Sequence, residues 1–135
     1  MNSGKALYGR LAADETVTGL VGRRIRKVRA SQNELLPYIV YRRLNTQRAH
    51  ITTGASHGLP TARYMLLCYA ATQEAAEILA DVVRVSLDGW RDLLTTPRVQ
   101  ACLVDDDSDG MDNPIDGDEI GDQFVSLEIR LTYEE

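Results

Sequence analysis

The sequence contains few of the residues that form disulfide bonds, and few aromatic residues and prolines. It contains two cysteines, one tryptophan, one phenylalanine and four prolines in 135 residues. Cys68 and Cys102 each lie in an apolar run, and a disulfide-built domain of this size would need more cysteines. We therefore expect two buried free thiols in a reducing cytosol. Long apolar runs are also missing, so neither a signal peptide nor a membrane span is predicted.

Catalytic and cofactor motifs are equally scarce. The sequence has no Gly-x-Ser-x-Gly elbow, no Walker loop and no His-Glu-x-x-His pattern. His50 and His57 lie in a polar segment without a neighbouring carboxylate, whereas a metal site needs more ligands in fixed positions. We expect a protein that is not an enzyme and that carries no cofactor.

The length of 135 residues predicts one domain over residues 1–135. Ser3 and Asp14 are candidate caps of two short helices, and Gly22 ends the second. Thr72 is the candidate cap of a longer helix over 73–88, which Gly89 ends. Its predicted apolar stripe consists of Ala75, Ala76, Leu79, Val82, Val83 and Leu87.

Strands are predicted between and after these helices. They cover residues 24–30 (an edge strand), 37–44, 62–70 (a central strand), 99–104 and 123–133. The last of these alternates cleanly between apolar and polar residues, as in a strand with one buried face. Because parallel βαβ repetition is missing, we predict an α+β fold. An antiparallel sheet of four to five strands carries its helices on one face, which gives two layers.

Two segments read as loops. Residues 45–61 offer almost nothing to bury and predict a long hairpin loop, and residues 105–122 predict an acidic loop. Within the second, Asp105, Asp107, Asp109, Gly110 and Asp116 match the spacing of a calcium loop. Asp112 stands where an apolar residue is usual, Asp116 replaces a glutamate, and a strand rather than a helix precedes the segment. A solvated acidic loop is therefore favoured over a calcium site.

Charge is distributed unevenly along the chain. Residues 1–70 carry 11 Lys/Arg and 3 Asp/Glu, a balance of +8, and residues 71–135 carry 4 and 17, a balance of −13. Two solvated faces would explain this asymmetry. The sharper interpretation is that a basic surface meets the acidic surface of a neighbouring copy, in a head-to-tail contact that can close into a ring.

The basic residues form a candidate interface with a neighbouring subunit or another partner. It comprises Arg23, Arg24, Arg26, Lys27, Arg29, Arg42, Arg43, Arg48 and His50. So many cations could also neutralise phosphates. The chain as a whole is acidic, with a pI of about 5.0, whereas nucleic-acid-binding domains are usually strongly basic. Specific binding of DNA is therefore the weaker alternative.

Four stretches of the sequence carry a family resemblance. These are Ala6–Tyr8 with Leu20–Ile25, then Pro37–Tyr41, then Arg63–Ala70 running into a helix, and finally the alternating strand that ends Leu131-Thr132-Tyr133. In this order they resemble the tail-completion family of long-tailed phages and phage-like particles, which includes tail terminators and head-to-tail joining proteins. The resemblance covers about residues 5–133.

The resemblance implies a structural virion protein at the head-proximal end of the tail, made in the host cytoplasm. Such a protein caps the tail tube, stops its polymerisation and joins the tail to the head connector or stopper, as a homo-oligomeric, hexameric ring. The candidate basic interface named above would then contact a neighbouring subunit or the tail tube. No membrane is involved, and DNA passes through the lumen without specific binding. We expect Asp105, Asp106, Asp107 and Asp109 to face that lumen, where negative charge repels phosphates. Another neck component (a stopper or adaptor) and a calcium-loaded binding module remain the alternatives.

Overall fold

The computed structural model describes residues 3–28, 35–48, 60–94, 98–111 and 123–134. Within them lie three helices and five strands. The helices are α1 (Ser3–Ala13), α2 (Glu15–Val21) and α3 (Gln73–Leu87). The strands are β1 (Ile25–Lys27), β2 (Tyr38–Gln47), β3 (Thr61–Ala70), β4 (Val99–Met111) and β5 (Gln123–Tyr133). None of the helices described has the length and apolar composition to cross a membrane.

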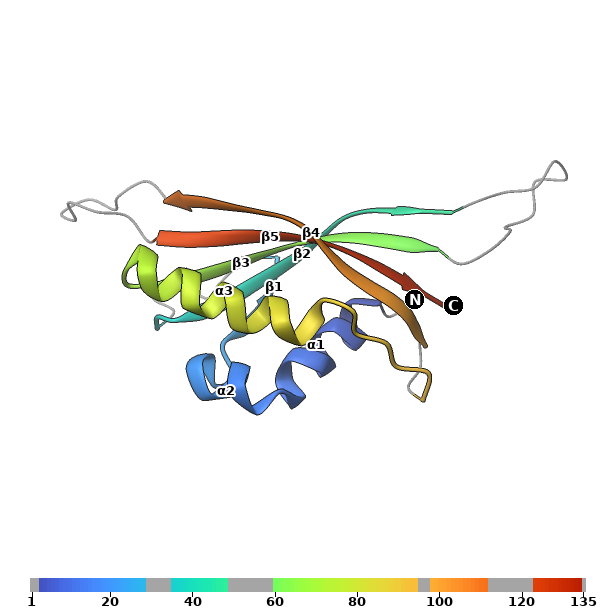
Figure 1. Ribbon diagram of the computed structural model, residues 1–135, viewed down its shortest axis with the longest axis horizontal. Coiled ribbons are helices and arrows are strands. Elements are labelled where there is room, and N and C mark those ends of the chain that lie inside the picture. The colour runs from blue at the N-terminus through green and yellow to red at the C-terminus, as the bar shows by residue number, and fades with distance from the viewer. Residues whose placement is uncertain (1–2, 29–34, 49–59, 95–97, 112–122, 135) are drawn as a thin grey trace, which may run out of the picture.

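The strands form one sheet in the order β1-β2-β3-β5-β4, and Figure 1 shows the helices on the same side of it. The α+β class is confirmed, and β3 is the central strand. The prediction of a purely antiparallel sheet is wrong, because β1 pairs in parallel with β2 while the other pairs are antiparallel. Residues 28–37 separate β1 from β2, which is far more than a tight hairpin turn, so the chain can return to the same end of the sheet.

The helix ends follow from local chemistry. The Asp14 carboxylate accepts from the backbone N–H groups of Thr16 and Val17, and the Thr72 hydroxyl accepts from that of Ala75. These bonds satisfy donors that the first helical turn leaves free. Gly22 and Gly89 follow α2 and α3 with positive φ angles of 59° and 80°. The predicted caps Asp14 and Thr72 and the predicted stops Gly22 and Gly89 are confirmed, and they fix where the chain enters and leaves the sheet.

The main core lies between the helices and the sheet. In β5, Val125, Leu127, Ile129, Leu131 and Tyr133 are all buried, as the alternation predicts. The face that α3 buries differs slightly from the predicted stripe: Ala75 is exposed and Val82 half-buried, whereas Ala80 and Ser86 are buried. Trp90 folds back onto this core, and the Arg10 guanidinium lies 5.7 Å from its ring centroid.

The opposite face of the sheet carries a second, smaller cluster. Tyr38 stacks on Tyr69 with ring centroids 4.7 Å apart, and Phe124 packs against Tyr69 at 5.1 Å. Val40 completes the buried part of the cluster. Since no described helix covers this side (Figure 1), the aromatic rings shield each other and one end of the outer face.

The acidic segment is not a loop over the part described. Residues 105–111 continue β4 and pair with β5, after a register shift between Val104 and Asp106. The pairing supplies backbone hydrogen bonds that the sequence pattern did not reveal. Likewise, residues 45–47 and Thr61 of the predicted hairpin loop belong to β2 and β3. The remainder of both predicted loops lies outside the described residues.

Candidate assembly surfaces

A basic cavity of about 630 Å³ opens where β1 ends beside β2. It lies between the first turns of α1 and the strands. Its lining combines four cations, three tyrosines and small residues: Ser3, Gly4, Lys5, Tyr8, Lys27, Val28, Tyr41, Arg42, Arg43 and Tyr64. No acidic side chain is among these lining residues, so the cavity suits an anionic group.

Buried hydroxyl groups hold the floor of this cavity in place. The hydroxyls of Ser3 and Tyr64 lie 2.7 Å apart, and both side chains are buried although 61 residues separate them in sequence. Ser3, predicted as a cap, is instead the first residue of α1, and its hydroxyl ties the helix to β3. Burial raises the pKa of both Tyr41 and Tyr64, so these phenols remain neutral donors at ordinary pH.

The basic interface predicted from sequence is only partly brought together. Lys27, Arg42 and Arg43 share the cavity. Arg24 lies before β1 and donates from Nε to the carbonyl of Pro37 at 2.9 Å, a bond that ties the start of β1 to the start of β2. Arg23, Arg26 and Arg48 are described, but none of them lines the cavity. Arg29 and His50 lie outside the described residues.

Sequence reasoning missed the contribution of α1 to this site. Lys5 and Tyr8 stand on the first turns of the helix and face the cavity together with the strand cations. Their i, i+3 spacing places them on the same helix face. The sequence shows this spacing. It does not show which strand this face of the helix contacts, because that depends on how α1 packs on the sheet.

The four aspartates of β4 divide between the two faces of the sheet. Directly opposite residues of an antiparallel pair share a face. Asp107 and Asp109 lie opposite the buried Leu127 and Val125 and therefore point to the helix side. Asp106 lies opposite Glu128 on the outer side, and the Asp105 carboxylate accepts from Nε of Arg130 there at 2.7 Å.

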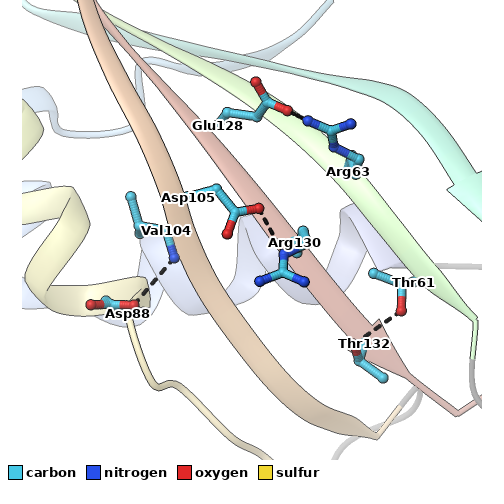
Figure 2. A network of polar contacts seen from close by, with 8 residues as sticks. All are labelled: Thr61, Arg63, Asp88, Val104, Asp105, Glu128, Arg130 and Thr132. Carbon is cyan, nitrogen blue, oxygen red and sulfur yellow. Dashed lines mark hydrogen bonds and ion pairs between the residues drawn. The ribbon is translucent and has the colours of Figure 1, made fainter.

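Figure 2 shows the polar network on that outer side. Arg63 pairs with Glu128, and the hydroxyls of Thr61 and Thr132 lie 3.1 Å apart. At the edge, the Asp88 carboxylate accepts from the backbone N–H of Val104 at 3.2 Å. The network fixes β4, β5 and β3 relative to each other, so the acidic end of β4 is presented on a firm support.

On the helix side, Asp107 and Asp109 face α3 across a small depression of about 290 Å³. Glu77, Asp81 and Arg84 of that helix share its lining. The described residues hold no group of three or more His, Cys, Asp or Glu side chains placed to bind a metal ion.

The calcium-loop interpretation is wrong for Asp105, Asp107 and Asp109. A strand sends Asp105 to one face and the other two to the opposite face, whereas a calcium loop must curl its ligands around one ion. Asp116 lies outside the described residues.

The two cysteines are buried and unpaired. Burial raises the pKa of Cys68 to about 12, and the pKa of Cys102 to about 12 as well. A thiolate is the reactive form of cysteine. Both thiols therefore behave as small apolar core groups.

Together these features define a small α+β domain with oppositely charged sheet edges. A chain from a solved structure titled "Virion of native gene transfer agent (GTA) particle" shares this fold, with a TM-score of 0.74 and 16% sequence identity. The match covers 96% of the present chain and 92% of the other. Comparison with curated proteins found no match.

The family model described as "Tail completion protein gp17" matches residues 5–114. The chain belongs to this family of tail completion proteins. The predicted family is thereby confirmed, and the protein is a structural component of a virion tail.

Proposed function

We propose that this tail completion protein caps the finished tail tube, ends its polymerisation and joins the tail to the head connector or stopper. It acts at the head-proximal end of the tail after synthesis in the host cytoplasm. The observation that carries this proposal is the family match over residues 5–114. A cap needs binding surfaces rather than a catalytic group, and charged surfaces are what the fold presents at its edges.

The proposal includes a homo-oligomeric, hexameric ring. A ring of identical subunits with head-to-tail contacts needs two different, complementary surfaces on each copy. The basic cavity beside β2 and the acidic end of β4 lie at opposite edges of the sheet and meet this requirement. If the lateral contacts are ionic, assembly weakens as salt rises, because screening shortens to about 3 Å at 1 M. Assembly that strengthens with salt would indicate an apolar interface.

The outer face of the sheet is our candidate for the lumen wall. Asp105 and Asp106 lie on that face, whereas Asp107 and Asp109 lie on the helix side, so we assign the lumen role to the first two only. Since Arg130 already neutralises Asp105, Asp106 carries the repulsion of DNA phosphates. An Asp106→Asn variant should then slow DNA ejection and leave the number of tailed particles unchanged. Ejection at the normal rate would contradict the lumen assignment.

Deletion of the gene from its parent particle tests the proposed function. Negative-stain electron microscopy of the lysate should show filled heads without tails, beside tubes that are abnormally long or unjoined. Normal tailed particles would overturn the proposal. Cross-linking of the wild-type protein to the tube subunit, rather than to the connector alone, distinguishes a tail cap from a stopper or adaptor.

A further inference from the structure

In the part of the chain that the structure describes, each edge of the sheet is paired over one stretch and unpaired over another. On one side, β1 pairs only with Ile39–Tyr41 of β2, and the last bond of this edge runs from the N–H of Val28 to the carbonyl of Tyr41. Within the described ranges, nothing pairs with the outer edge of β2 from Arg42 to Gln47. An open strand edge presents unpaired N–H and C=O groups to other chains.

The opposite edge has the same design. Asp92 exchanges two backbone hydrogen bonds with Val99, the N–H of Gly89 donates to the carbonyl of Cys102, and Asp88 caps the N–H of Val104. These contacts cover β4 up to Val104. Beyond that residue, no described segment pairs with its outer edge.

The two open stretches carry opposite charge. Arg42 and Arg43 are exposed on the β2 stretch, and the β4 stretch carries Asp106, Asp107 and Asp109. None of these three aspartates forms an ion pair with another residue in the described part of the chain, whereas Asp105 does. Their carboxylates are thus available to a partner.

The basic cavity adjoins the open stretch of β2 on the helix side. Lys5 and Tyr8 of α1 form one wall, and the other is formed at Arg43, which lies opposite the buried Tyr64; Arg42 also belongs to the lining, but it lies opposite Met65 and points to the outer face. A strand added to this edge would direct every second side chain to the helix side of the sheet. Asp107 and Asp109 have that spacing and that side in their own sheet.

We propose that the acidic end of β4 in one copy adds to the open edge of β2 in the next copy, with Asp107 and Asp109 entering its basic cavity. The added strand runs antiparallel to β2 and continues the sheet from copy to copy. Backbone hydrogen bonds give the contact its affinity and the carboxylates fix its register, as in other cases of strand addition. The inference rests on the ring proposed above and names the surfaces that build it.

The same charges explain why only this pairing forms. Two β4 ends would place aspartates opposite aspartates, and two β2 edges would place arginines opposite arginines; both arrangements repel. Only the unlike pairing brings opposite charges together, so each copy has one donor edge and one acceptor edge. A contact of this type is heterologous and closes into a ring when its rotation allows.

The pairing also requires a shift along the strands. Within one copy, Gly110 lies at the level of Tyr38, and Ala101 lies near the level of Gln47. The acidic end of β4 and the open end of β2 are therefore at opposite ends of the sheet. Neighbouring copies must be staggered by several residues, at about 3.3 Å each. A closed ring absorbs such a stagger by tilting its strands relative to the ring axis.

Charge reversal on the two edges tests the inference. The donor variant is Asp107→Lys with Asp109→Lys, and the acceptor variant is Arg42→Glu with Arg43→Glu. Each is supplied in place of the deleted gene, and tailed particles are counted. We expect each variant alone to lower the count at least ten-fold, because its two edges then carry the same charge. Expressed together, the variants can alternate around an even-numbered ring, so the count should recover.

A matched control carries the same charge change elsewhere. Glu15→Lys with Glu74→Lys makes the same charge change as the donor variant on exposed positions of α2 and α3, outside the depression that Asp107 and Asp109 line, and should complement like wild type. Far-UV circular dichroism of the purified variants confirms that they fold. If either edge variant alone complements fully, or if both are folded and their mixture still fails, the edge pairing is overturned. The tail-completion proposal fails separately, through normal particles in the deletion lysate.

Cross-linking provides a second readout that does not depend on charge. Arg43→Cys and Asp109→Cys in one chain, treated with a short bismaleimide on assembled tails, should give covalent multimers of this chain. Each single-cysteine variant should give monomers, because Cys68 and Cys102 are buried. Monomers from the double variant as well would overturn the proposal.

Discussion

The hydroxyl groups of Tyr64 and Tyr133 allow one substitution to be tested in two opposite environments. Both side chains are buried, at 3% and 0% exposure. The Tyr64 hydroxyl bonds to that of Ser3, whereas the Tyr133 hydroxyl has no partner among the described residues. A tyrosine-to-phenylalanine substitution removes one oxygen atom at either site. Any difference between the two changes in the free energy of unfolding therefore reflects the hydrogen bond of Tyr64.

The two tyrosine substitutions should differ in their effect on the free energy of unfolding. Tyr64→Phe leaves the buried Ser3 hydroxyl without its partner, and an orphaned polar group of this kind costs roughly 1–3 kcal/mol. Tyr133→Phe removes a hydroxyl that is already unpaired, so the free energy of unfolding should stay constant or rise by up to about 1 kcal/mol. The Ser3→Ala/Tyr64→Phe double variant removes both partners and should recover most of the loss, which gives a coupling energy of about 1 kcal/mol or more.

Urea unfolding followed by the fluorescence of Trp90 measures these changes, since this residue is the only tryptophan and is buried. The free energies come from the midpoints and slopes of five curves, for wild type, Ser3→Ala, Tyr64→Phe, Tyr133→Phe and the Ser3→Ala/Tyr64→Phe double variant. Equal destabilisation by the two tyrosine substitutions would refute the reasoning. So would a double variant as unstable as the sum of its two single changes.

Further predictions concern the core and the thiols. Leu79→Ala should lower the free energy of unfolding by about 2–5 kcal/mol, because Leu79 is only 1% exposed. Ile78→Ala should lower it by roughly 1 kcal/mol or less, because Ile78 is 53% exposed. Equal losses of stability in urea unfolding would contradict the burial assignment. A thiol-specific disulfide reagent at pH 8 should leave the native protein unmodified, because burial raises the pKa values of Cys68 and Cys102 to about 12. After unfolding, the same reagent should label two thiols. Rapid labelling of the native protein would contradict this prediction. The raised pKa values favour the folded state fully below pH 9, and this contribution is lost between pH 9 and 12 as unfolded thiols ionise. A Cys68→Ala variant should therefore lose less of its stability from pH 8 to pH 10 than wild type, and an unchanged slope would refute the linkage.

The local elements were predictable because their causes lie within a few residues of sequence. Asp14 and Thr72 cap their helices through side chains next to the N–H groups that need partners. The alternation of β5 directly specifies a strand with one buried face, since successive side chains point to opposite sides. The family resemblance, too, followed from the order of such apolar patterns, and the match over residues 5–114 confirms it.

The errors arise where a segment depends on distant neighbours. Residues 105–109 are rich in aspartate, which is uncommon in strands, yet pairing with β5 satisfies their backbone groups and extends β4. The match to the calcium-loop spacing was misleading for the same reason. The spacing depends only on positions along the chain, whereas the face of the sheet to which each carboxylate points depends on the pairing of β4 with β5. The parallel pairing of β1 with β2 likewise depends on the route of the chain between them.

The sequence by itself determined the ends of α2 and α3, the apolar faces, the burial of both thiols and the family, because short-range sterics and apolar periodicity govern them. Only the tertiary structure decided which charges meet. It brought Lys5 from α1 beside Arg42 and Arg43 of β2, and it split the four aspartates of β4 between two faces. Among the described residues, it also left one basic stretch of β2 and one acidic stretch of β4 without a pairing strand on the outer side. Such groupings depend on packing and on strand register, which join residues far apart in the chain.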